Sequence, residues 1–182
     1  MKMTAFEIAP VTSDEAFASL FSPSDDDSKG AGPARLVVVD LHMEWSGPTV
    51  VANPLFSKLW HSADSPESFL SFVSAERESL RAINERVKAA ANKAEEENIV
   101  IRRRNAFSPM FSVSDSARWT RLVSTSNPSC KPLFLFILVE SEPVDPKYPR
   151  PTARIVDKVE GMHPPMLTRA FREHYPGEMS IR

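Results

Sequence analysis

The stretch that decides the fold runs from Val37 to Thr49 and reads Val-Val-Val-Asp-Leu-His-Met-Glu-Trp-Ser-Gly-Pro-Thr. It starts inside an apolar run, Leu36 to Leu41, which only Asp40 interrupts. A run of this kind predicts a strand that is buried on both faces of an open α/β sheet. A turn containing Gly47 and Pro48 follows, so the strand leads through a tight turn into the next element.

That next element is predicted to be a helix. Apolar residues recur at helical spacing from Val50 to Trp60, and the helix is expected to end near His61. Pro54 lies inside the pattern and predicts a kink, because proline lacks the backbone N–H and clashes with the preceding turn. The order is therefore strand, turn and kinked helix.

These residues resemble the active-site strand and turn of thioredoxins, whose motif is Trp-Cys-Gly-Pro-Cys. The matching residues here are Trp45, Ser46, Gly47, Pro48 and Thr49, so serine and threonine stand where both cysteines belong. Four further features match the thioredoxin pattern in residue type and position. They are Asp40 six residues before Ser46, Pro54 in the following helix, Lys131-Pro132 before a strand and Gly161 before the last helix.

The resemblance implies a fold and two positions near the turn. The fold class is α/β, a thioredoxin fold with a central mixed sheet, helices on both faces and an inserted long helix. The resemblance also implies that the bond before Pro132 is cis and that this proline faces the turn, beside Trp45 and Ser46. Asp40 is expected to be a buried, hydrogen-bonded carboxylate that comes with the fold.

The flanking sequence supplies the remaining elements of one domain, 1–182. It predicts a strand at 6–9, a helix capped by Ser13 or Asp14, strands at 99–101, 110–113, 133–139 and 152–159, a short helix at 119–123 and a closing helix from Met166 to Tyr175. Three insertions are expected: an acidic loop at 22–33, a helical insertion at 62–97 and a proline-rich hairpin loop at 140–151.

The helical insertion is predicted to be one long helix from Pro66 to Glu97, with Ser65 as its cap. Its apolar residues alternate steps of four and three, with Glu76 as the single violation. We expect this face to bind a partner protein through Phe69, Val73, Leu80, Ile83 and Val87. The third strand of the sheet has two candidates, 70–73 and 110–113, and the spacing from Asp115 to Pro132 favours the second.

The residues at the turn do not support enzyme chemistry. Disulfide exchange needs a thiolate, which Ser46 and Thr49 cannot supply. A nucleophilic Ser46 would need an adjacent base, and the motif offers only Asp40 and His42. We therefore expect no enzyme activity. One alternative is a monothiol or glutathione-linked protein that uses Cys130, and another is a thioredoxin-fold adaptor or chaperone that binds peptides.

Composition excludes several other classes. The 182 residues carry a formal net charge of −2, one cysteine and four histidines, so neither an internal disulfide nor a multi-cysteine zinc site is possible. We expect no cofactor, no metal, no nucleic-acid partner and no membrane span. The start of the chain has no apolar signal segment, which makes a cytoplasmic location the expectation.

A narrower resemblance lies in two segments after the turn. Cys130 to Phe136 and Val159 to Leu167 are similar to the thioredoxin domains of axonemal dynein light chains and of flagellar thioredoxin–nucleoside diphosphate kinase fusions. This resemblance implies a subunit of a hetero-complex in the cytoskeleton of a cilium or flagellum, with axonemal dynein, tubulin or other flagellar subunits as partners. The basic cluster Arg102, Arg103 and Arg104 is a candidate contact with an acidic filament.

Overall fold

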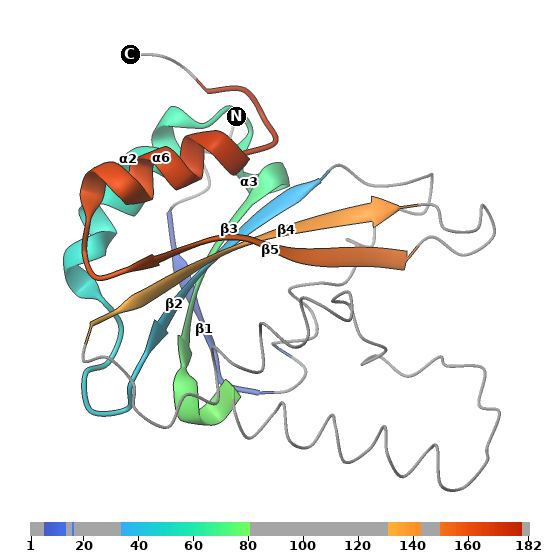
Figure 1. The fold of residues 1–182 in the computed structure, drawn as a ribbon. Helices are drawn as coiled ribbons and strands as arrows, with labels where there is room; N and C mark the ends of the chain where they lie inside the picture. The colour runs from blue at the N-terminus through green and yellow to red at the C-terminus, as the bar shows by residue number, and fades with distance from the viewer. Residues whose placement is uncertain (1–5, 14–15, 17–33, 81–130, 143–149, 180–182) are drawn as a thin grey trace, which may run out of the picture.

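The computed structural model describes residues 6–13, 16, 34–80, 131–142 and 150–179. Their centre is a five-stranded sheet in the order β1-β3-β2-β4-β5 (Figure 1). The strands are β1 (Ile8–Val11), β2 (Arg35–His42), β3 (Leu70–Glu76), β4 (Leu133–Glu142) and β5 (Arg150–Glu160). Strands β1, β3 and β2 are parallel, while β4 and β5 are antiparallel to their neighbours. This order and these directions are those of the thioredoxin fold.

Strand β2 is the central strand, as the apolar run predicts. It pairs with β3 on one side and with β4 on the other, and its residues from Leu36 to Leu41 are all buried. Alternate side chains of β2 enter two separate core clusters, Leu36 and Val38 on one face and Val37 and Val39 on the other. Both faces of the sheet are therefore buried, which explains why the run is continuous rather than alternating.

Helices α2 (Asn53–Ser62) and α6 (Pro164–His174) lie side by side on one face of the sheet (Figure 1). They bury Phe56 and Phe171 against this face. The rings of Phe56 and Phe72 stack with centroids 4.8 Å apart, and Phe72 stacks on Phe171 at 6.3 Å. On the other face the described residues include the helical turn 77–80, which contributes the buried Leu80.

The predicted long helix is wrong over residues 70–76, which form a strand, although residues 77–80 are again helical. Helix α3 (Pro66–Phe69) lasts one turn, and the next residues form β3 between β1 and β2. The heptad spacing arose because β3 is buried on both faces, so its apolar residues are too frequent to distinguish a strand from a helix. Glu76, the one heptad violation, is the last residue of β3. Residues 81–97 lie outside the described residues.

The third strand is therefore 70–76, and the preference for 110–113 was wrong. The assignment of 62–97 to one helical insertion fails for the same reason, because α3 and β3 belong to it. Predictions at 14–15, 17–33 and 81–130 fall outside the described residues, including the acidic loop at 22–33, the strands at 99–101 and 110–113 and the helix at 119–123.

Smaller predictions are confirmed or shifted at their boundaries. The expected cap contact of Ser13 is present, since its hydroxyl accepts a hydrogen bond from the N–H of Ala16 at 3.1 Å, while the other residues of the predicted first helix lie outside the described residues. The hairpin loop is shorter than 140–151, because β4 extends to Glu142 and β5 starts at Arg150. No described helix is long and apolar enough to cross a membrane.

Pro54 does not kink a helix. A short 3-10 helix, Val50–Ala52, precedes α2, and Pro54 lies in the first turn of α2. The missing N–H of a proline costs nothing there, because the first N–H groups of a helix have no partner within the helix. Pro164 and Pro165 begin α6 in the same way, two residues before the predicted start at Met166.

Candidate functional site

The candidate site lies at the end of the sheet where β2 reaches its carboxyl end. We call this end of the strands the edge. Leu41 of β2 pairs with Leu133 at the start of β4, and Leu133 pairs with Glu160 at the end of β5. The turn 43–49 leaves this edge, and helices α2 and α6 both begin beside it (Figure 1). Loops at the carboxyl ends of strands are where α/β sheets usually place binding sites.

The turn is held by its own backbone. The N–H groups of Ser46 and Gly47 both donate to the carbonyl oxygen of Met43 at 3.1 Å. Gly47 adopts a positive φ of 62°, in the left-handed region that glycine enters without strain. The motif residues therefore form a closed turn of defined geometry.

Beneath the turn, Asp40 and Thr49 form a buried polar pair. The Asp40 carboxylate accepts the backbone N–H of Thr49 at 2.6 Å and its hydroxyl at 2.9 Å. Asp40 is only 2% exposed, and burial raises the pKa of its carboxyl above the ordinary value of 3.8, although the two Thr49 hydrogen bonds and nearby His42 oppose the shift. The expected buried carboxylate is present, and both its oxygens bind Thr49.

Among the residues that the structure describes, Ser46 has no hydrogen-bonded base. Its hydroxyl lies 3.1 Å from the Met43 carbonyl oxygen, to which it donates, and 3.3 Å from that of Gly47. Nδ1 of His42 lies within hydrogen-bond distance of the Met43 carbonyl oxygen, at 3.2 Å. The carboxylate of Asp40 accepts its hydrogen bonds from Thr49. The geometry contains no hydrogen-bonded nucleophile and base at the turn.

Above the turn, large apolar side chains face solvent. Trp45 is 70% exposed, and Val50 and Val51 are each 69% exposed. Met166, at the start of α6, is the fourth large apolar residue of the described part of the chain that is exposed. Trp45 lies in the turn, Val50 and Val51 lie in the 3-10 helix that leads into α2, and Met166 lies in the first turn of α6. We call them the edge cluster.

The sequence motif placed only Trp45 of this cluster at the site, as the first residue of the Trp-Ser-Gly-Pro-Thr turn. Val50, Val51 and Met166 were assigned to helices, where apolar residues usually face the core. The buried face of α2 is instead formed by Phe56 and Leu59 further along the helix. Val50 and Val51 are adjacent and precede the helical spacing of Phe56 and Leu59. Two neighbouring apolar residues cannot both lie on one helix face, which was the sequence signal that some of them point outward.

Pro132 lies at the same edge, directly before β4. Its carbonyl oxygen accepts the N–H of Gly161 at 2.7 Å, which joins the start of β4 to the end of β5. The described residues contain no cis peptide bond, so the bond from Lys131 to Pro132 is trans and the expected cis bond was wrong. The trans form is the more stable isomer of a prolyl bond unless the surroundings impose cis. Cys130 lies outside the described residues.

Of the residues predicted to bind a partner through the long helix, the three that the structure describes are not on an open surface. Val73 and Leu80 are each 1% exposed, and Phe69 is half-buried against Tyr175, with ring centroids 6.4 Å apart. They stabilise the core instead, because the segment that holds Val73 is a strand. Ile83, Val87, Arg102, Arg103 and Arg104 lie outside the described residues. Within those residues no group of acidic, histidine or cysteine side chains could hold a metal.

No protein-family model matches the chain, and no curated protein matches it significantly. Three solved structures overlap with it at low similarity. One, from a study of thiol resolution in yeast mitochondrial 1-Cys peroxiredoxin through the glutathione and thioredoxin systems, is 14% identical over 94% of this chain and 99% of that chain, with a TM-score of 0.41. Thioredoxin from Malassezia sympodialis is 15% identical over 96% and 97%, with a TM-score of 0.40.

Oxidised thioredoxin from Plasmodium falciparum is 17% identical over 93% of this chain and 99% of that chain, with a TM-score of 0.42. Structural similarity at this level is too low to support an argument about this chain. The assignment of the thioredoxin fold depends on the strand order and strand directions of the sheet.

Proposed function

We propose that this protein is a redox-inactive interaction subunit built on a thioredoxin fold. The observation that supports this most strongly is the pair formed by Asp40 and Thr49. At the position where a second redox cysteine would stand, a threonine gives both its N–H and its hydroxyl to a buried carboxylate. With Ser46 at the other position, the turn holds no thiol, and a thiolate is what disulfide exchange requires.

The edge cluster supports the interaction role. Large exposed apolar side chains that gather in one place are typical of surfaces that bind other proteins. Trp45, Val50 and Val51 are more than two-thirds exposed and project from a turn and a helix start that are rigidly held. The proposed contact surface is therefore the edge cluster, and it replaces the long helix that the sequence suggested.

The proposed setting is a large cytoskeletal assembly, the axoneme of a cilium or flagellum, with a dynein or microtubule-associated subunit as partner. The support for this setting is the sequence similarity of the segments at Cys130 and Val159 to axonemal thioredoxin domains. A stable hetero-complex predicts that the protein co-fractionates with salt-resistant filaments.

A second candidate is an adaptor or chaperone that binds peptides transiently. The same edge cluster favours it, because an apolar patch on a thioredoxin fold can accept an extended segment. This role predicts a free pool of the protein instead of co-fractionation with filaments. The monothiol alternative depends on Cys130, and no observation on the described residues favours it.

Cross-linking mass spectrometry on native extracts tests the interaction role. We expect lysine cross-links from Lys58 or Lys131, both exposed, to one recurring partner. We expect these cross-links to disappear when Trp45→Ala, Val50→Ser and Val51→Ser are combined. Arg154→Ala, an exposed change on β5, serves as the control and should retain them. Recovery of the native protein only as a free monomer, with no recurring cross-link, would contradict the proposal.

A further inference from the structure

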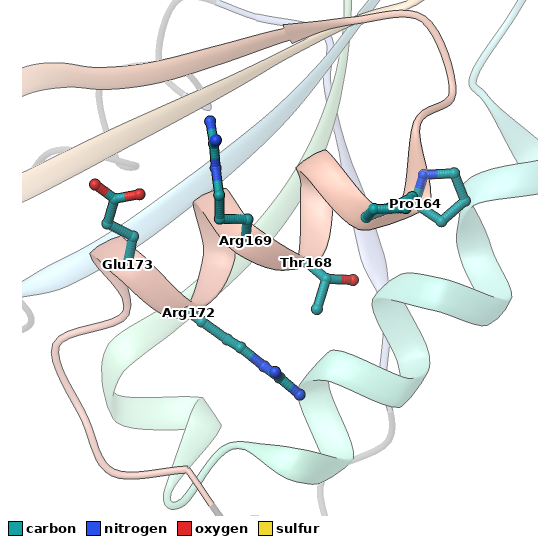
Figure 2. Close-up of a pocket in the computed structure, with 6 residues that line it drawn as sticks. Pro164, Thr168, Arg169, Arg172 and Glu173 are labelled. Carbon is teal, nitrogen blue, oxygen red and sulfur yellow. The ribbon is translucent and has the colours of Figure 1, made fainter.

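The outer face of α6 has a shallow hollow with a volume of about 660 Å³. It is lined by two prolines and four polar or charged residues, namely Pro164, Pro165, Thr168, Arg169, Arg172 and Glu173. Figure 2 shows Thr168 and Arg172 pointing toward α2, while Arg169 and Glu173 extend from the opposite side of α6. The two guanidinium groups therefore flank the exposed face of the helix.

The two arginines of α6 differ from the exposed cations of β5. Arg154 forms an ion pair with Glu140 at 3.1 Å, and Lys158 forms one with Glu160 at 3.3 Å. Within the described parts of the chain, neither Arg169 nor Arg172 has an ion-pair partner, although Glu173 stands four residues after Arg169, at the helical spacing that permits a pair. Both guanidinium groups are thus available to an external acceptor.

The chemistry of this face selects a class of ligand. A guanidinium is planar, always charged and suited to a carboxylate, to which it can donate two parallel hydrogen bonds. Met166, three residues before Arg169 on the same stripe of the helix, is 45% exposed and belongs to the edge cluster. Two cations that are unpaired among the described residues, beside an apolar side chain, match a protein segment that combines carboxylates with an apolar residue.

We propose that the outer face of α6 binds an acidic segment of a partner protein, with its carboxylates on Arg169 and Arg172 and an apolar side chain on Met166. The inference rests on the proposed interaction role and adds the chemistry of the partner. Glu173 repels carboxylates at the C-terminal end of α6, so the segment extends from the arginines toward the N-terminal end of the helix and the edge cluster.

A binding titration on the full chain tests this inference. The probe is a fluorescently labelled synthetic peptide of repeated Glu-Glu-Leu units, and the reference peptide has glutamine in place of every glutamate. Arg169→Gln combined with Arg172→Gln removes both guanidinium groups from α6. Arg154→Gln combined with Lys158→Gln is the matched control, because it changes the net charge of the chain by the same amount on β5.

We expect the acidic peptide to bind the native chain, with an affinity that falls as salt is raised. The α6 variant should bind about fivefold more weakly, which is the size expected from losing two exposed charge contacts, and the β5 control should stay within about twofold. Three results would overturn the inference: no saturable binding to the native chain, equal losses in both variants, or equal binding of the glutamine peptide.

The outcome is separable from that of the proposed function. If native extracts yield a recurring partner while the acidic peptide fails to bind, only the assignment of α6 is wrong. If the peptide binds at α6 while native extracts yield no partner, the proposed role as a complex subunit is wrong and the surface remains assigned.

Discussion

The inner and outer sides of the turn after β2 differ sharply. On the inner side, Asp40 and Thr49 are hydrogen-bonded to one another, and the carboxylate is 2% exposed. On the outer side, Trp45, Val50 and Val51 are about 70% exposed. The twelve residues 40–51 thus combine a closed polar contact with an open apolar surface.

The difference separates stability from recognition. A buried carboxylate is tolerated only when hydrogen bonds satisfy it, so Asp40 and Thr49 are accounted for by the needs of the fold. Exposed apolar side chains forgo the stabilisation that burial provides, so the fold alone does not account for the outer side. Substitutions on the inner side should therefore change the free energy of unfolding, and substitutions on the outer side should change partner binding.

The largest contrast in stability is expected between Phe56 in α2 and Val51 in the 3-10 helix that precedes it. Phe56 is 2% exposed and contacts Phe72 and Phe134, with ring centroids 4.8 and 5.5 Å away. Phe56→Ala should lower the free energy of unfolding by about 3 to 5 kcal/mol, because it opens a cavity. Val51→Ala, five residues earlier on the exposed side, should change it by less than about 0.5 kcal/mol. Urea unfolding of both variants measures the contrast, and equal losses would contradict it.

A smaller contrast is expected between the two hydroxyl groups of the motif. Thr49→Val removes one of the donors to the buried Asp40 carboxylate and should cost about 1 to 3 kcal/mol of unfolding free energy. Ser46→Ala removes an exposed hydroxyl and should cost less than about 0.5 kcal/mol. The same urea titrations test this pair. A Ser46→Ala loss as large as that of Thr49→Val would place Ser46 in a structural role that its contacts do not indicate.

Asp40→Asn should change how stability depends on pH. Because burial raises the pKa of Asp40 in the folded chain, its ionised form is less stable there than in the unfolded chain. The native protein therefore loses stability as the pH rises from 3.8 through the folded-state pKa. The asparagine variant stays neutral, so its stability relative to that of the native protein should be higher near about pH 8 than near about pH 3. Parallel unfolding curves at all pH values would contradict the raised pKa.

The sequence predicts the elements whose signals are local. The apolar run at Leu36–Leu41, the glycine and proline of the turn and the Ser13 cap each depend on a few neighbouring residues, and the structure confirms them. The resemblance correctly predicts a buried Asp40. The identity of its partner, Thr49, becomes clear only once the turn brings the two residues together.

Features that depend on distant contacts were not predictable. Residues 70–76 have apolar spacing that suits a helix or a doubly buried strand, and only pairing with β1 and β2 decides between them. The exposure of Val50, Val51 and Met166 depends on how α2 and α6 pack on the sheet, which no local pattern encodes. The unpaired state of Arg169 within the described residues is likewise a property of side-chain placement.

Insulin reduction is the measurement that tests the proposed absence of redox chemistry most directly. With dithiothreitol as reductant, the native protein and a Cys130→Ser variant should leave the rate of insulin precipitation at the level of dithiothreitol alone. Ser46→Cys combined with Thr49→Cys places a dithiol in the same turn above Asp40 and should raise the rate well above that level. A native protein that accelerates insulin reduction as strongly as this double variant would contradict the account.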